Sequence, residues 1–346
     1  MKKIQEELKE RILILDGAMG TMIQQEKLEE DDFRGAKFKD TKILLKGNND
    51  ILNLTKEKLI YDIHTKYLMS GADIIETNTF NSTRVSQSDY DCADISNELN
   101  FQGGKIARKA VDDYLEKNPN EVKFVAGVLG PTNRTCSMSP DVNNPGFRNI
   151  SFDQLYNDYE KSTEALIKAG VDVIMVETIF DTLNAKAALN AIEGACKKTN
   201  RIIPIMISAT ITDLSGRTLS GQTIEAFYNS IMHVNPLSVG LNCALGPKEL
   251  EPYIIELHRI SESFISVHPN AGLPNAFGEY DETPESMSNF AGKWSQNGYI
   301  NIIGGCCGAT PEHINLMAQK VKNIKPREKK TFDPKLRLSG LESFKF

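Results

Sequence analysis

The sequence alternates eight times between a short apolar run and a longer amphipathic stretch, and this regularity limits the possible fold more than any other feature. The runs are rich in Ile and Val and almost continuously apolar, which is typical of parallel strands buried on both faces. Eight strand–helix units favour a closed barrel over an open doubly wound sheet, so we predict an α/β (β/α)8 TIM barrel as a single domain. The predicted strands are 11–15, 72–77, 123–129, 171–177, 203–209, 237–242, 264–268 and 300–304.

The amphipathic stretches carry helix start and stop signals. Ser151 and Gln154 have the spacing of a capping box. Residues 283–285 and 310–312 each read Thr-Pro-Glu, an N-cap followed by a proline and an acid in the first turn. Glycines are expected to end the helices before three of the strands, at Gly71, Gly170 and Gly298.

One strand unit is repeated within the chain. Residues 71–77 (GADIIET) resemble residues 170–178 (GVDVIMVET), with two residues inserted in the second copy. This similarity supports a fold of repeated strand–helix units. No G-x-G-x-x-G follows the first predicted strand, which counts against a dinucleotide-binding fold.

Composition and charge exclude several classes of protein. The 346-residue chain has no apolar stretch of about 18 residues and no signal-peptide core, so we expect a cytoplasmic protein that makes no membrane contact. Its net charge of -6 provides no basic surface, and we expect no nucleic-acid partner. Six cysteines without secretory features argue against a disulfide framework.

The expected organisation is an N-terminal helix at 1–10, the barrel at 11–322 and a C-terminal linker or tail at 323–346. From Lys320 onward, nine Lys and Arg residues accompany three acidic ones. A solvated linker or a terminal strap is a better interpretation of this charge run than an arm that binds a polyanion.

Polar residues follow the predicted strands at their carboxyl ends, where barrel enzymes form their active sites. Two of these ends carry thiols, with Cys243 after one strand and the adjacent pair Cys306 and Cys307 after the last. The separation of 63 positions between Cys243 and Cys306 fits no zinc-finger spacing, so only the fold would bring the three together. The polar residues at the strand ends are Asp16, Asn78, Thr132, Glu177, Thr210, Asn242, Cys243, Asn270, Cys306 and Cys307.

Three thiols at one barrel mouth suit a tetrahedral thiolate site with an open fourth position, which is typical of catalytic zinc. Zinc binds thiolates, so its binding releases protons and is favourable at neutral pH. A substrate thiol in the open position would ionise and could attack an alkyl carbon. The alternatives are buried cysteines acting as small hydrophobes and a redox or vicinal disulfide. For the other three cysteines, which lack partners, the structural interpretation is preferred; they are Cys92, Cys136 and Cys196.

Two strand-end acids could orient an ammonium group. Asp16 follows the first predicted strand and Glu177 the fourth. A helix cap for Asp16 and an internal ion pair for Glu177 are the structural alternatives. His268 is expected to be a core histidine or a group behind the site. Three histidines are expected on helix surfaces, namely His64, His258 and His313.

Seven motifs together resemble the homocysteine-binding barrel of cobalamin-dependent methionine synthases, in the homocysteine S-methyltransferase family. The likeness runs from about residue 10 to residue 322. Betaine– and S-methylmethionine–homocysteine methyltransferases share this barrel and its three-cysteine site. The motifs are DGAMGT at 16–21, ETNTF at 76–80, GVLGPT at 127–132, ETIFDT at 177–182, GLNC at 240–243, PNAGLP at 269–274 and GGCCG at 304–308.

The resemblance implies roles for individual residues. The implied ligands of Zn²⁺ are Cys243, Cys306, Cys307 and, before the substrate arrives, Asn270. The implied contacts of the substrate's ammonium group are Asp16 and Glu177. The implied contacts of its carboxylate are Gly17, Ser137 and Gly308.

The resemblance also implies the reaction. Zinc would activate L-homocysteine as a thiolate, and the product of S-methylation would be methionine. The methyl group would come from methylcobalamin on another corrinoid domain or protein, since no D-x-H-x-x-G cobalamin motif is present here. A folate domain would follow in a full-length synthase. The alternatives are a small donor, either betaine or S-methylmethionine, and a non-catalytic module that binds zinc or thiols.

Overall fold

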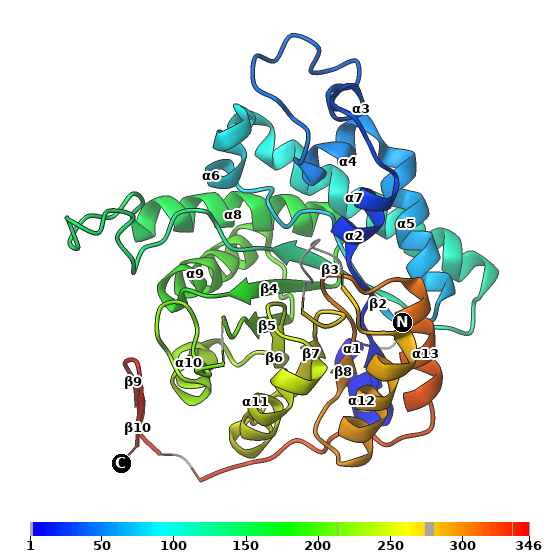
Figure 1. Cartoon of the computed structure of the whole chain (residues 1–346), viewed down its shortest axis with the longest axis vertical. Coiled ribbons are helices and arrows are strands. Elements are labelled where there is room, and N and C mark those ends of the chain that lie inside the picture. The colour runs from blue at the N-terminus through cyan, green and yellow to red at the C-terminus, as the bar shows by residue number, and fades with distance from the viewer. Residues whose placement is uncertain (1–2, 213, 274–279, 334, 346) are drawn as a thin grey trace.

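Eight parallel strands form a ring that is surrounded by helices (Figure 1). This arrangement comes from a computed structural model of the chain, which describes residues 3–212, 214–273, 280–333 and 335–345. The strands are β1 (Leu13–Ile14), β2 (Ile74–Glu76), β3 (Phe124–Leu129), β4 (Val173–Ile179), β5 (Ile205–Ala209), β6 (Ser238–Asn242), β7 (Phe264–His268) and β8 (Ile302–Ile303).

The ring closes through β1, which pairs on both sides. Leu13 pairs with Ile302 of β8, and Leu15 forms a parallel bridge with Ile74 of β2. The Asp16 N–H donates to the Ile74 carbonyl at 3.0 Å and extends the pairing of β1 with β2 toward the carboxyl ends of the strands. The predicted (β/α)8 barrel is therefore confirmed.

The helices occupy the stretches between the strands. The capping box of Ser151 and Gln154 begins α8, and Thr283 and Thr310 precede the N1 prolines of α12 and α13. The helices are α1 (Ile4–Glu10), α2 (Met19–Gln25), α3 (Glu30–Arg34), α4 (Leu52–Thr55), α5 (Glu57–Met69), α6 (Arg84–Gln87), α7 (Ser96–Lys117), α8 (Phe152–Ala169), α9 (Thr182–Thr199), α10 (Ile224–Ile231), α11 (Pro247–Ile260), α12 (Pro284–Gln296) and α13 (Pro311–Val321).

The buried apolar residues form two clusters. The larger fills the space between the strands and the outer helices. The smaller fills the barrel interior and includes Leu13, Met175 and Ile302 from three strands. Ile4 and Leu8 of α1 belong to this interior cluster, so the N-terminal helix packs onto the end of the barrel where the strands begin.

The internal repeat has a structural counterpart. Asp73, just before β2, accepts a hydrogen bond from the Ile14 N–H and pairs with Arg11 at 2.7 Å. Asp172, just before β4, accepts from the Val125 N–H in the same way, and its ion-pair partner is Arg108. Both copies therefore use their aspartate to join a strand to the one before it in the sequence.

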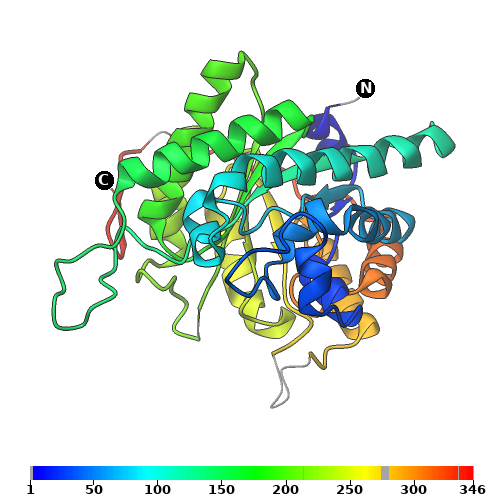
Figure 2. The same ribbon diagram turned by 90° about the horizontal axis from the view of Figure 1, so that it is seen from above.

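Part of the C-terminal tail, residues 323–346, makes hydrogen bonds and packing contacts with the barrel. Arg327 is buried, and its guanidinium donates to the carbonyls of Ser261 and Ser263. Farther on, β9 (Arg337–Ser339) and β10 (Ser343–Lys345) form an antiparallel hairpin against α10 (Figure 1). Viewed along the perpendicular direction, the hairpin again lies at the edge of the molecule (Figure 2).

Two expectations about histidines are wrong. His64 is fully buried on α5, and His313 is buried on α13, where its imidazole contacts the Thr310 hydroxyl. These helices pack their inner faces on the barrel, and both histidines lie on that face. None of the helices among the described residues is both long enough and apolar enough to cross a membrane.

The packing of α1 predicts that Leu8→Ala destabilises the protein. Leu8 is fully buried in the interior cluster, so truncation leaves a cavity and lowers the free energy of unfolding by about 2–5 kcal/mol. Urea denaturation measures this loss. Met69→Ala, at a site 75% exposed, is the control and should change the same quantity by less than about 0.5 kcal/mol. Equal effects of the two substitutions would contradict the role of α1.

Candidate active site

The carboxyl ends of the strands surround a cavity of about 360 Å³. Its lining comes from the ends of β1, β2, β3, β4, β6, β7 and β8 and from the loops that follow several of them. Among the predicted strand-end residues, those that line it are Asp16, Asn78, Glu177, Cys243, Cys306 and Cys307. Thr132 and Thr210 are absent from the described lining. They bond instead to backbone carbonyls, those of Arg134 and Asn242.

The three thiols predicted to meet are together in the structure. The sulfurs of Cys243, Cys306 and Cys307 all lie within 4.8 Å of one another. The Cys243 and Cys307 sulfurs are 3.9 Å apart. Two thiolates on a tetrahedral zinc with Zn–S distances of about 2.3 Å would be about 3.8 Å apart, so the spacing suits that ion.

Backbone geometry holds the thiols in position. Cys243 has φ = 60° and Ala244 has φ = 56°, left-handed conformations that cost energy for residues other than glycine. The loops after β7 and β8 are joined by two hydrogen bonds, Cys306 N–H to the Pro269 carbonyl and Ala271 N–H to the Cys307 carbonyl, each 2.8 Å. The backbone therefore turns sharply at Cys243, and the hydrogen bonds between the two loops hold Cys306 and Cys307 in position.

The thiols share hydrogen bonds in a way that favours an anionic centre. Hydrogen bonds from Cys243 and Cys306 lower the pKa of Cys307. The pKa of Cys306 is raised well above its usual value, because its thiol hydrogen-bonds with those of Cys243 and Cys307 and is buried. The arrangement concentrates negative charge on one sulfur, as expected of a group of thiols suited to a soft cation.

The proposed fourth ligand also has free acceptor capacity. Asn270 is buried, and its Oδ1 accepts no hydrogen bond from the residues that the structure describes. Such a buried acceptor without a partner is uncommon. The three thiols therefore fit a metal ion, while Asn270 is absent from the described cavity lining and its role as a fourth ligand stays a prediction.

Tyr280 belongs to the site but carries no sequence signal beyond its place in a predicted loop. It lines the cavity, and its hydroxyl hydrogen-bonds with the Cys307 thiol. Its ring lies over Gly308, which has φ = 81°; a Cβ added there would be 2.5 Å from the Tyr280 Cβ. Gly308 must remain glycine both for its conformation and for this close contact.

The two predicted acids line the same cavity, and neither structural alternative is observed. Asp16 is buried and does not cap α2; its Oδ2 accepts from the Glu76 N–H at 3.1 Å. Glu177 is buried and forms no ion pair within the described part of the chain. Burial, with a contribution from negative charge at Cys307, raises the pKa of Glu177 to about 7. Burial also raises the pKa of Asp16 well above its usual range.

Asn242 fixes the Glu177 side chain, a role that the sequence did not reveal. Its Nδ2 donates to Glu177 Oε2 at 3.1 Å and to Thr178 Oγ1 at 2.8 Å, and its Oδ1 accepts from the Thr178 N–H. Thr178 has φ = 54° and lies at a register shift between β4 and β5. This bulge directs Glu177 into the cavity, in keeping with the frequent occurrence of bulges beside active sites.

The three expected carboxylate contacts differ in their positions. Gly17 lines the cavity, and a Cβ there would lie 2.8 Å from the Ala309 carbonyl oxygen. The Gly308 N–H donates to Thr21 Oγ1 at 3.0 Å. Ser137 donates to Asp181, the N-cap of α9, and is absent from the described lining. Of the three, only Gly17 faces the cavity directly.

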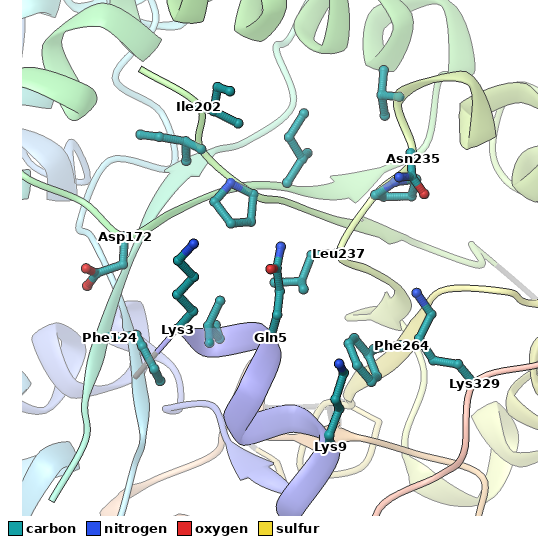
Figure 3. A pocket seen from close by; sticks show the side chains of 16 residues that line it. Lys3, Gln5, Lys9, Phe124, Asp172, Ile202, Asn235, Leu237, Phe264 and Lys329 are labelled. Atoms are coloured by element: carbon teal, nitrogen blue, oxygen red, sulfur yellow. The ribbon is translucent and has the colours of Figure 1, made fainter. Parts of the chain in front are cut away.

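A larger cavity, of about 840 Å³, lies at the opposite end of the barrel (Figure 3). Residues at the beginnings of the strands line it, among them Phe124 of β3 and Phe264 of β7. Lys3, Lys9 and Lys329 are also in the lining (Figure 3). It contains no thiol among the described residues, and this end of a barrel ordinarily serves stability, so the smaller cavity is the candidate active site.

A closed barrel that gathers three thiols and several buried acids at the carboxyl ends of its strands has the construction of a TIM-barrel enzyme. Comparison with known families makes the class more specific. The sequence model of homocysteine S-methyltransferase matches residues 13–321. The chain therefore belongs to the homocysteine S-methyltransferase family, and it is a methyltransferase of that family.

Solved structures of similar fold agree with this assignment. The metallated form of the homocysteine methyltransferase MmuM from Escherichia coli superposes with a TM-score of 0.70 at 22% sequence identity, covering 90% of this chain and 97% of that one. The oxidized form of the same enzyme gives a TM-score of 0.67 at 21% identity, covering 89% and 96%. At these identities the likeness establishes a common fold.

The environment of Asp50 leads to a prediction about pH. Asp50 lines the cavity, and burial raises its pKa to about 6. A raised carboxyl pKa means that the folded state holds the proton more tightly, so ionisation between about pH 4 and pH 6 destabilises the wild type. The free energy of unfolding of Asp50→Asn, relative to the wild type, should rise by up to about 3 kcal/mol across this window and then stay level.

Urea denaturation at several pH values measures this difference. Asp31→Asn is the control, because Asp31 is an exposed acid of α3 outside the cavity lining. A difference between Asp50→Asn and the wild type that does not change with pH would contradict the prediction.

Proposed function

We propose that this chain transfers a methyl group to the sulfur of L-homocysteine, giving methionine, with the help of a zinc ion. The convergence of three sulfurs within 4.8 Å in the cavity at the barrel mouth carries the proposal. Membership of the homocysteine S-methyltransferase family supports the acceptor and the reaction class. The similar enzyme MmuM has been solved in a metallated form, which supports the presence of a metal.

Cys243, Cys306 and Cys307 would hold the ion, with Asn270 as the fourth ligand before the substrate binds. Zinc would supply the Lewis acidity that keeps the substrate sulfur deprotonated at neutral pH. Tyr280, through its hydrogen bond with Cys307, would orient the sulfur of this ligand. The protein then contributes by positioning the substrate for in-line attack.

The amino-acid part of the substrate would lie against the acids. Asp16 and Glu177 would accept hydrogen bonds from its ammonium group. The described cavity lining includes neither lysine nor arginine, so the substrate carboxylate has to be bound by neutral donors. Gly17 is the best placed of the three candidates, and Ser137 and Gly308 would need to exchange their present partners.

For the methyl donor we favour methylcobalamin carried by another domain or protein, with a folate domain following in a full-length synthase. The motifs shared with cobalamin-dependent synthases support this choice. A small donor, betaine or S-methylmethionine, is the alternative within the same family. A module that binds zinc and the amino acid without catalysis is a third possibility, of a different class.

The metal assignment predicts that Cys306→Ala and Cys307→Ala each lose zinc. Removing one of three thiolates leaves too few ligands for a tight site, so zinc per chain, measured by mass spectrometry after dialysis, should fall well below one. Methyl transfer should be lost together with it. Cys196→Ala is the control, because Cys196 lies on α9 outside the cavity lining. Full zinc occupancy with normal turnover in Cys307→Ala would reject the assignment.

The donor assignment is tested by supplying the purified chain with zinc, L-homocysteine and one donor at a time. We expect methionine with methylcobalamin and none with betaine or S-methylmethionine. Turnover with a small donor alone would reverse the assignment. Tight homocysteine binding without methionine from any of the three donors would favour the non-catalytic module.

A further inference from the structure

Glu76 is the counterpart of Glu177 in the internal repeat, yet the function described so far gives it no role. Both glutamates end a strand or lie near its end, in β2 and β4, and both are followed by a threonine. Both line the cavity. A repeat that places two equivalent carboxylates in one cavity suggests that both contact the same ligand.

We propose that Glu76 and His268 complete, with Asp16 and Glu177, a cage that binds the ammonium group of the substrate, so that the site accepts thiols only as free amino acids. The proposal rests on the proposed function and extends it to substrate selection. Below, the four residues are called the ammonium cage.

The residues of the ammonium cage lie close together in the structure. A carboxylate oxygen of Glu76, a carboxylate oxygen of Glu177 and a ring nitrogen of His268 all lie within 4.8 Å of one another. Asp16 joins them through the Glu76 N–H, which donates to Asp16 Oδ2 at 3.1 Å. The four side chains come from the ends of β1, β2, β4 and β7, and all four line the same cavity.

Three atoms of the cage have no partner in the described structure. These are Asp16 Oδ1, Glu76 Oε1 and His268 Nε2, all buried. Asp16 is 3% exposed and His268 only 1%, so solvent does not satisfy them, and all three residues line the cavity. Leaving buried polar atoms without partners is costly, which indicates that a ligand supplies the missing hydrogen bonds.

An ammonium group matches this set of atoms. It presents three N–H donors, and the cage offers two carboxylate oxygens and, in one tautomer, an imidazole nitrogen as acceptors. It also brings positive charge to a cavity whose described lining has four acids and no lysine or arginine. Buried carboxylates favour a partner of opposite charge, and an acylated or absent amino group would provide none.

A divalent cation is the rival occupant, since two carboxylates and a histidine also make a metal ligand set. The ammonium group is favoured because its three N–H donors match the three buried atoms without partners, and because the proposed substrate carries an amino group.

The test compares paired ligands that differ only in the amino group. Glu76→Gln keeps the side-chain size and removes the charge. Calorimetric titration of the zinc-loaded variant with L-homocysteine should show a Kd raised about ten- to one-hundredfold, as expected for a lost charge-assisted hydrogen bond. The Kd of 4-mercaptobutanoate, the same thiol without its amino group, should change less than about twofold, because it never uses the cage.

A second ligand pair separates this inference from the zinc proposal. L-Methionine and 4-(methylthio)butanoate have no free thiol, so their binding can be compared in metal-free protein. Glu76→Gln should again weaken only the amino acid. A wild type that binds L-methionine but holds no zinc would contradict the proposed function and leave the ammonium cage supported.

Two further variants complete the design. His268→Leu should show the same selective loss, and circular dichroism checks that it folds. Asp158→Asn is the matched control, because Asp158 is a buried acid outside the described cavity lining whose oxygens already accept from the Arg84 and Val85 N–H groups. Its Kd values should not change selectively.

Three results would overturn the ammonium cage. The first is an unchanged L-homocysteine Kd in Glu76→Gln. The second is an equal loss for both members of a ligand pair, which would indicate only a structural role. The third is a second divalent ion per wild-type chain that disappears in Glu76→Gln, which would assign the residues to a metal.

Discussion

The pairing of β1 with both β8 and β2 is the interaction on which the site depends. The Leu13–Ile302 pair and the Leu15–Ile74 bridge close the ring, and the Gly305 N–H donates to the Asp16 carbonyl at 3.1 Å just beyond them. This pairing brings the first and last strands together and places Asp16 beside β8, which is followed by Cys306 and Cys307. An open sheet of the same strands would leave these groups apart.

The charge of the cavity explains what such a site can bind. Three thiols and four acids line it, and its described lining has neither lysine nor arginine. Buried anions without counter-ions are unfavourable, so the site is complete only with cationic partners. The proposed zinc ion at the sulfurs and the ammonium group at the acids would provide these two charges, and homocysteine would connect them.

Particular residues show why some of the site was predictable and some was not. Cys243 and the Cys306–Cys307 pair were recognisable because each follows a strand, and parallel strands end at the same mouth. The role of Asn242 and the presence of Tyr280 in the site were missed, because an asparagine at a strand end and a tyrosine in a loop have no distinctive pattern. Their importance comes from contacts with Glu177 and Cys307, residues more than 25 positions away.

The sequence by itself determined the number and order of the strands, the helix caps and the thiols at strand ends, because periodicity, capping and turn chemistry act over a few residues. Tertiary structure alone decided the rest. It shortened β1 and β8 to two residues, buried His64 and carried β4 through a bulge at Thr178. These outcomes depend on packing between distant segments, which no local pattern records.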